Sequence, residues 1–172
     1  MTSALVRTVF FPLMDLVLDP PHGVAPVRLG MTYAEALAAV TKAFGAPRTA
    51  REGLISTSLD GIGFQVLLEK RDRVTALELW WPGEGRTSST RVLLDGDDVF
   101  TTPARDVLRR AAARGWTVED PDEEYTSIPG VTLGFTRMTS QEVPRERDGL
   151  PVCFTSVLVA DERYYDGPDV IR

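Results

Sequence analysis

One histidine and one cysteine limit the acid-base and nucleophilic chemistry that this chain of 172 residues can carry. His22 lies in the turn-like segment Asp-Pro-Pro-His-Gly, and any Ser-His-Asp or Cys-His site would depend on it. No Gly-x-Ser-x-Gly motif surrounds a serine, and Cys153 lies in an apolar run rather than at a helix N-terminus. We therefore predict a turn position for His22 and a buried mid-strand position for Cys153, and we assign no catalytic residue.

Carboxylates are plentiful, but their spacing does not match a metal site. The acidic loop, residues 119–124, reads Glu-Asp-Pro-Asp-Glu-Glu, and a second acidic segment covers 95–98. Neither has the spacing of an EF-hand loop, and a single histidine with a single cysteine excludes the usual zinc patterns. Residues 29–32 have one glycine and no lysine, which excludes a Walker-type phosphate loop. We expect no metal and no cofactor, with weak calcium binding by the acidic loop as the alternative.

Charge is distributed unevenly along the chain, which has 19 basic and 25 acidic residues and a net charge of −6. Residues 1–86 carry nine residues of each sign, so the whole acidic surplus lies in residues 87–172. An acidic surface repels the phosphates of nucleic acids and attracts basic proteins. We therefore expect a protein partner with a basic surface and no nucleic acid.

The aromatic residues suggest where such a partner would bind. Trp80 and Trp81 are adjacent on a predicted strand, so they must point to opposite faces of the sheet. Trp81 shares the parity of Leu77 and Leu79, which predicts that Trp81 is buried and that Trp80 lies with Glu78 on the open face. The alternative is that Trp80 packs under the C-terminal tail. Tyrosines among acidic residues (Tyr125, Tyr164 and Tyr165) also suit a basic protein partner. The candidate partner-binding residues are Trp80, Glu119, Asp120, Asp122, Glu123, Glu124 and Tyr125.

Two helices of similar design must position these residues. The first covers 32–45, with Thr32 as N-cap, Glu35 completing a capping box, and Gly45 at the stop. Its apolar face comprises Leu37, Val40 and Phe44.

The second helix covers 102–115, with Thr102 as N-cap, Pro103 in the first helical position and Gly115 at the stop. Both caps and both stops are offset by 70 residues between the two helices. Its apolar face comprises Val107, Leu108 and Ala111. Its basic stripe comprises Arg105, Arg109, Arg110 and Arg114, which we interpret as a solvated face paired with nearby carboxylates, including those of the acidic loop, rather than as a phosphate site.

Similar strands surround each helix, which indicates an internal repeat. The predicted strands are 16–18, 61–68 and 74–81 around the first helix, and 91–94, 130–137 and 152–159 around the second. The predicted fold class is α+β: two related strand-helix-strand-strand halves join into an antiparallel sheet with both helices packed on one face. We divide the chain into a possible N-terminal extension (1–13), a first half (14–86) and a second half (87–172), which together form one compact unit.

Two resemblances add to this interpretation. The segment Leu29-Gly-Met-Thr-Tyr-Ala-Glu-Ala, with Phe44-Gly-Ala-Pro after it, resembles the opening motif of the small outer-membrane-assembly lipoprotein fold, which occurs in tandem in the β-lactamase-inhibitor-protein-like fold. The second half lacks the Gly-Met-Thr, and the chain has no lipoprotein signal and no disulfide. The segment 20–23, Pro-Pro-His-Gly, also resembles uncharacterised proteins of GC-rich Gram-positive bacteria. These resemblances imply a binding scaffold that presents a concave sheet to another protein, and no activity.

The leading functional hypothesis is a non-enzymatic protein-binding module, an inhibitor or immunity-type protein, acting through an open sheet face and the acidic loop. The alternatives are a small-molecule-binding protein with a pocket between helix and sheet, or an enzyme of unidentified class.

The apolar segment 5–18 is interrupted by Arg7, Pro12 and Asp15, so it predicts neither a membrane span nor a signal peptide. A lone cysteine fits a cytoplasmic location.

Overall fold

A computed structural model describes residues 14–69 and 72–162 of the protein. Its helices and strands alternate in the predicted order, with additional short strands between them. In chain order the elements are β1 (Met14–Asp19), β2 (Gly23–Val24), β3 (Val27–Arg28), α1 (Tyr33–Phe44), β4 (Thr49–Arg51), β5 (Leu54–Leu59), β6 (Ile62–Glu69), β7 (Arg73–Trp80), β8 (Thr90–Leu94), β9 (Asp97–Asp98), α2 (Ala104–Ala113), β10 (Tyr125–Ile128), the 3-10 turn η1 (Pro129–Val131), β11 (Leu133–Thr136) and β12 (Ser156–Ala160).

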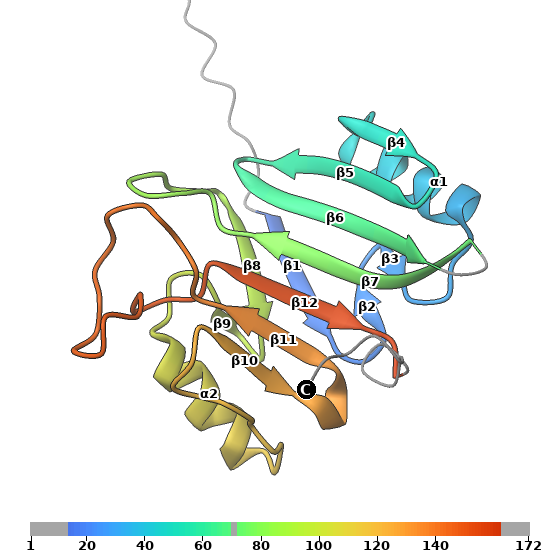
Figure 1. Ribbon diagram of the computed structural model, residues 1–172. Helices are drawn as coiled ribbons and strands as arrows, with labels where there is room; N and C mark the ends of the chain where they lie inside the picture. Colours follow the sequence, from blue (N-terminus) through green and yellow to red (C-terminus); the bar gives the residue numbers. More distant parts are fainter. Residues whose placement is uncertain (1–13, 70–71, 163–172) are drawn as a thin grey trace, which may run out of the picture.

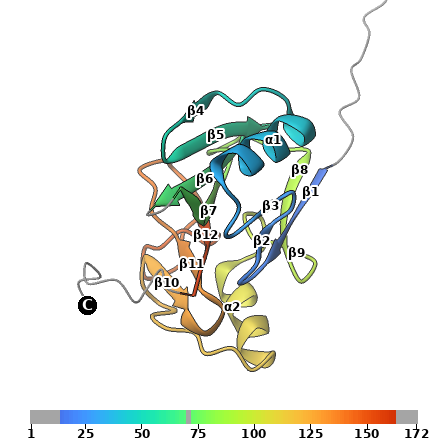
Figure 2. The same ribbon diagram turned by 90° about the vertical axis from the view of Figure 1, so that its right-hand side faces the viewer.

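The strands form two sheets (Figure 1). The larger sheet has seven strands in the order β10-β11-β12-β7-β6-β5-β4, and all its neighbours are antiparallel. The smaller sheet has five strands in the order β3-β2-β1-β8-β9, with β1 and β8 parallel. Figure 2 shows that α1, the smaller sheet and α2 all lie on one side of the larger sheet, which we call the covered face. We call the opposite side the open face.

The predicted α+β class, with both helices on one face of an antiparallel sheet, is therefore confirmed. The larger sheet is also built from two similar three-strand units, β5-β6-β7 and β10-β11-β12, which meet where β7 pairs with β12. The smaller sheet, which lies between the two helices, goes beyond the prediction. It forms because β1 and β8, the strands that precede the helices in each half, pair with each other instead of with the larger sheet.

The core lies between the covered face and the elements that pack on it. Strand alternation points one apolar set inward. The set comprises Ile55, Phe64, Val66, Leu77, Leu79, Leu133, Phe135, Val157 and Val159, all at most 1% exposed. Helix α1 adds buried Ala36 and Val40, and its Phe44 ring meets the edge of the Phe64 ring with centroids 5.5 Å apart. Helix α2 adds Val107, Leu108 and Ala111, the face predicted for it.

Helix α1 begins as predicted, whereas α2 does not. The Thr32 hydroxyl accepts a hydrogen bond from the Glu35 amide, and the Glu35 carboxylate accepts one from the Thr32 amide, both at 3.2 Å. The prediction that Thr102 caps α2 is wrong, because Pro103 holds the cap position with no side-chain bond. A distant backbone group instead satisfies the first amide of the helix: the Ala104 amide donates to the Val152 carbonyl at 2.8 Å.

Two strands begin later in the chain than the sequence predicts. Strand β11 starts at Leu133, because Pro129–Val131 form η1 and Thr132 has a φ of 49°. Strand β12 starts at Ser156, so the predicted mid-strand position of Cys153 is wrong. The segment before β12 is held by other partners: the Val152 amide donates to the Pro144 carbonyl at 3.0 Å.

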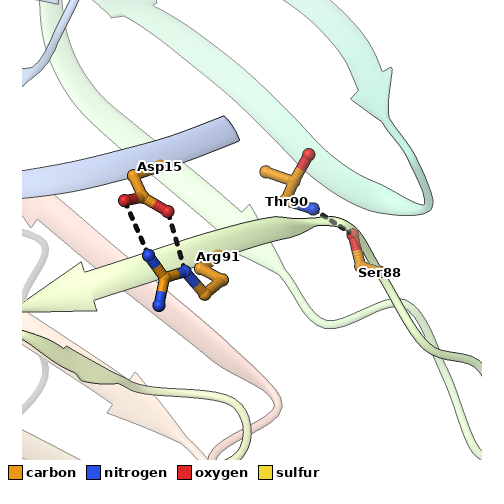
Figure 3. Close-up of polar contacts among 4 residues, drawn as sticks. All are labelled: Asp15, Ser88, Thr90 and Arg91. Carbon is orange, nitrogen blue, oxygen red and sulfur yellow. Dashed lines mark hydrogen bonds and ion pairs between the residues drawn. The ribbon is translucent and has the colours of Figure 1, made fainter. Parts of the chain in front are cut away.

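An ion pair links the two halves across the smaller sheet (Figure 3). The Arg91 guanidinium donates from Nε and Nη2 to the two carboxylate oxygens of Asp15, both at 2.8 Å, and so connects β8 with β1. The Asp15 carboxylate raises the pKa of Arg91. Just before β8, the Thr90 amide donates to the Ser88 hydroxyl at 3.0 Å.

Within the described residues, neither helix has the length and apolarity that a membrane crossing requires.

The contrast between the two helix starts is testable. We expect Thr32→Ala to lower the free energy of unfolding by about 1 kcal/mol, because it leaves the Glu35 amide without its acceptor. Thr102→Ala is the matched control and should change the free energy by less than about 0.5 kcal/mol. Urea unfolding followed by circular dichroism measures both, and equal losses from the two substitutions would contradict the assignment.

Candidate functional site

Two exposed aromatic side chains lie in one row across the open face. The strand registers align Tyr125 with Thr136, Thr136 with Ser156, and Ser156 with Trp80. Tyr125 is 44% exposed and Trp80 is 40% exposed. Three strand spacings of about 4.8 Å place their Cα atoms about 14 Å apart. Between them the hydroxyls of Thr136 and Ser156 lie 2.6 Å from each other. The structure thus brings together two of the predicted site residues.

The two tryptophans take the predicted sides of β7 and its continuation. Trp81 is partly buried and packs against the core, whereas Trp80 lies on the open face. The Trp80 side chain leans over Gly63 on β6, where an added Cβ would lie 3.1 Å from the indole Cδ1. The alternative position of Trp80 under the C-terminal tail involves residues 163–172, which lie outside the described residues, as do Tyr164 and Tyr165.

Glu78 occupies the next row of the open face. It is half-buried, and the registers place Gln65 on one side of it and Leu158 on the other. Within residues 14–69 and 72–162, its carboxylate has no hydrogen bond or ion pair. Burial raises the pKa of Glu78 above its ordinary value of 4.5. The prediction that Glu78 shares the face of Trp80 is confirmed, but its side chain is more buried than a solvent-facing carboxylate.

The acidic loop lies along the free edge of β10, where it follows α2 (Figure 1). Glu119 and Ser127 exchange two backbone hydrogen bonds, at 2.8 and 3.1 Å. The Thr126 hydroxyl donates to the Asp120 carbonyl at 3.1 Å, and the Glu123 amide donates to the same carbonyl at 3.2 Å. All five acidic side chains of the loop are exposed. The loop is therefore fixed through its backbone while its carboxylates face solvent.

Arg137 anchors the acidic loop through hydrogen bonds to the loop's backbone. This residue is only 6% exposed, and its Nη2 donates to the Pro121 carbonyl at 2.7 Å. Its backbone amide donates to the Glu124 carbonyl at 2.8 Å. The guanidinium carbon lies 5.9 Å from the centroid of the Phe154 ring, and the Nε atom has no hydrogen-bond partner in the described part of the chain. Because the cation binds a carbonyl instead of a carboxylate, it leaves the loop's acidic side chains unpaired.

Three of the four arginines of the basic stripe of α2 pair with carboxylates outside the acidic loop. Arg109 pairs with Asp106 at 2.9 Å, Arg110 pairs with Asp97, and Arg114 pairs with Asp95. The prediction that the arginines pair with carboxylates is confirmed for these three, whereas Arg105 forms no ion pair among the described residues. The predicted pairing with the acidic loop is wrong, because two of the three carboxylates come from the 95–98 segment and the third from α2 itself. None of the ion pairs formed among the described residues uses a carboxylate of the acidic loop.

The groups considered for catalysis lie apart from one another. His22 is exposed in the turn after β1, and its amide donates to the Asp19 carbonyl at 2.7 Å. Cys153 is half-buried, and burial together with the nearby Asp98 charge raises the pKa of its thiol. Hydrogen bonds from Ser89, just before β8, lower the pKa of Asp60. Among the residues that the structure describes, no group of three or more His, Cys, Asp or Glu side chains could hold a metal ion.

Two depressions in the described part of the surface do not match the enclosed apolar pocket that the small-molecule hypothesis requires. One of about 590 Å³ is lined by Glu84 and residues 140–145, which are mostly polar. Another, of about 10 Å³ between α2 and the 95–97 turn, has room for no more than a water molecule.

Two contributors to this face were not identified from the sequence. Gly63 has no side chain, and this leaves room for the Trp80 side chain on β6. The Gly-Phe pair at 63–64 would indicate this role only if the register of β6 with β7 were known. No sequence pattern identifies Arg137 as a functional residue, because its role depends on a contact with a loop 16 residues away.

Comparisons with family models, with curated proteins and with solved structures find no match to this chain. The fold and the geometry of the open face therefore carry the functional argument.

Glu78 should destabilise the folded protein at neutral pH. Its raised pKa means that the folded state holds the proton more tightly than the unfolded chain, so stability falls as the pH rises through the window between the unfolded and the folded pKa. We expect Glu78→Gln to raise the free energy of unfolding by about 0.5 kcal/mol at pH 7. The gain should vanish at a pH below the ordinary value of 4.5.

Urea unfolding between pH 8 and pH 4 tests this expectation. Glu69→Gln, at the exposed end of β6, is the matched control. A Glu78→Gln protein that is less stable than the wild type at pH 7 would show that the carboxylate stabilises the sheet.

Arg137 should act as the anchor of the acidic loop. We expect Arg137→Met to speed amide hydrogen exchange at Glu119 and Ser127 and to lower the free energy of unfolding by about 1–3 kcal/mol, because the Pro121 carbonyl loses a charged donor. Arg105→Met, at an exposed position of α2, is the control and should leave the exchange unchanged. Unaltered exchange in Arg137→Met would show that the loop's own backbone hydrogen bonds order it without Arg137.

Proposed function

We propose that this protein is a non-enzymatic protein-binding module of the inhibitor or immunity type. It binds a partner with a basic surface through the open face and the acidic loop. The observation that carries the proposal is a set of five exposed carboxylates, unpaired within residues 14–69 and 72–162, on a backbone-anchored loop at the edge of a face with two exposed aromatic rings.

The two parts of the surface contribute different terms to binding. Exposed Trp and Tyr side chains supply a large contact area at little cost in conformational entropy. Carboxylates that face solvent at the edge of the interface accelerate association with a basic partner, and they do so more strongly at low salt. Because the loop backbone is already ordered, binding requires little further ordering of the chain.

The distribution of internal ion pairs supports an acidic recognition surface. Three of the four arginines of the basic stripe are paired with Asp95, Asp97 and Asp106, so the stripe offers little free charge to a phosphate backbone. The acidic loop would repel such a backbone. We therefore propose a protein partner rather than nucleic acid, in the cytoplasmic setting that the lone cysteine favours.

The charge mechanism makes a specific prediction. A loop-neutral variant (Glu119→Gln, Asp120→Asn, Asp122→Asn, Glu123→Gln and Glu124→Gln) should lose its partner, because association slows by about ten-fold or more without the steering charge. A scatter-neutral variant is the matched control and removes the same number of charges from exposed positions elsewhere: Glu52→Gln, Glu69→Gln, Glu84→Gln, Glu142→Gln and Glu162→Gln.

The measurement is affinity capture from the lysate of the source cell with the three immobilised proteins, at low and at high salt, followed by identification by mass spectrometry. We expect a basic protein that the wild type and the scatter-neutral variant retain at low salt and that the loop-neutral variant does not. A partner held equally by all three proteins would refute the steering role of the loop.

A further inference from the structure

Trp80 and Glu78 point in the same direction from β7, because they are two residues apart on one strand. The indole leans over Gly63 toward β6 and is 40% exposed, so part of the ring is accessible from solvent. The Glu78 carboxylate lies in the neighbouring row, half-buried and without a partner in the described chain. A charged group in this position calls for a cation or a hydrogen-bond donor from outside.

Among the described residues, the positions next to this pair in the sheet supply no cation. The positions in register with Glu78 are Gln65 and Leu158, and those in register with Trp80 are Gly63 and Ser156. Ala76, the next residue of β7 on this face, is also uncharged. Glu78 is therefore the one ionisable side chain among these register positions, and its charge is not compensated locally.

The protein itself shows what completes such a pair. Beside α2, the guanidinium carbon of Arg114 lies 4.2 Å from the centroid of the Trp116 ring, and the same guanidinium pairs with the Asp95 carboxylate. An arginine thus stacks on an indole and binds a carboxylate simultaneously. On the open face the indole and the carboxylate are present, and no arginine of the described residues joins them.

We propose that Trp80 and Glu78 form a recognition site for an arginine side chain of the partner. The guanidinium stacks on the Trp80 indole and donates to the Glu78 carboxylate. Arginine fits better than lysine, because a planar guanidinium stacks on an aromatic face and matches a carboxylate with two parallel N–H groups. The inference rests on the proposed function and adds to it the chemical group that the partner must insert, while the acidic loop attracts the partner's wider basic surface.

The site can be tested without knowledge of the partner. The probe is N-acetyl-L-arginine amide, titrated into the full chain and followed by NMR of the tryptophan indole N–H signals. The neutral citrulline amide serves as the isosteric control. We expect the Trp80 signal to shift and saturate with arginine amide at millimolar concentration and to shift far less with citrulline amide. The Trp116 signal should remain in place, because Arg114 already occupies its ring.

Two variants and a control identify the groups involved. Trp80→Leu should abolish binding, which is then followed through the backbone amides of β6 and β7. Glu78→Gln should weaken binding by about two- to five-fold. The scatter-neutral variant should bind the amide as tightly as the wild type. Thermal unfolding of each variant confirms that it is folded, and Glu78→Gln keeps the test informative should Trp80→Leu lower stability.

The outcomes separate this inference from the proposed function. Equal shifts with citrulline and arginine, or an unmoved Trp80 signal, would overturn the arginine site, even if capture of a basic partner still depended on the acidic loop. A working arginine site without any loop-dependent capture would confirm the site and overturn the charge-steered binding.

Discussion

Strand β12 pairs with β7 from Ser156 and Trp80 at one end to Ala160 and Ala76 at the other, and this antiparallel pairing joins the two halves of the larger sheet. The register aligns Val157 with Leu79, which makes the core continuous across the junction. On the other side it aligns Trp80 with Ser156, and the registers of β12 with β11 and of β11 with β10 continue this row to Tyr125. A slip by one residue would exchange the two faces, exposing the core leucines and burying Glu78. The pairing of β7 with β12 thus fixes both the core and the row of side chains on the open face.

The difference between the two faces follows from what packs on them. The covered face receives both helices and the smaller sheet, so its side chains are apolar and almost fully buried. The open face carries hydroxyls, a glutamine and small residues, together with half-buried leucines such as Leu158 and Leu67. Against this background an exposed indole and a half-buried carboxylate whose pKa is raised are unfavourable for stability. Natural chains tolerate such local conflicts mainly where function requires them.

Local signals in the sequence correctly predicted the elements that local interactions determine. The capping box of Thr32 and Glu35, the apolar face of α2 and the opposite orientations of Trp80 and Trp81 all follow from spacing alone. The errors arise where a distant backbone group decides the outcome. Pro103 replaces Thr102 as the cap of α2 because Val152 satisfies the Ala104 amide, and the segment around Cys153 is irregular because it bonds to 144 and 104. No local pattern encodes these contacts, and the same holds for the bond from Arg137 to the acidic loop.

Cations and carboxylates are used differently in this molecule, and that difference locates its acidic surplus. Arg91, Arg110 and Arg114 each pair with an aspartate of the chain itself. Arg137 is buried but binds a main-chain carbonyl, so it orders the acidic loop without neutralising it. The acidic loop holds five of the sixteen acidic residues of the second half, which carries the whole net charge of −6, and it lies beside the open face. Arg91 on β8 and Arg109, Arg110 and Arg114 on α2 each pair with an aspartate, so none of these cations offsets the charge of the loop, and this is the physical basis on which we propose a basic partner.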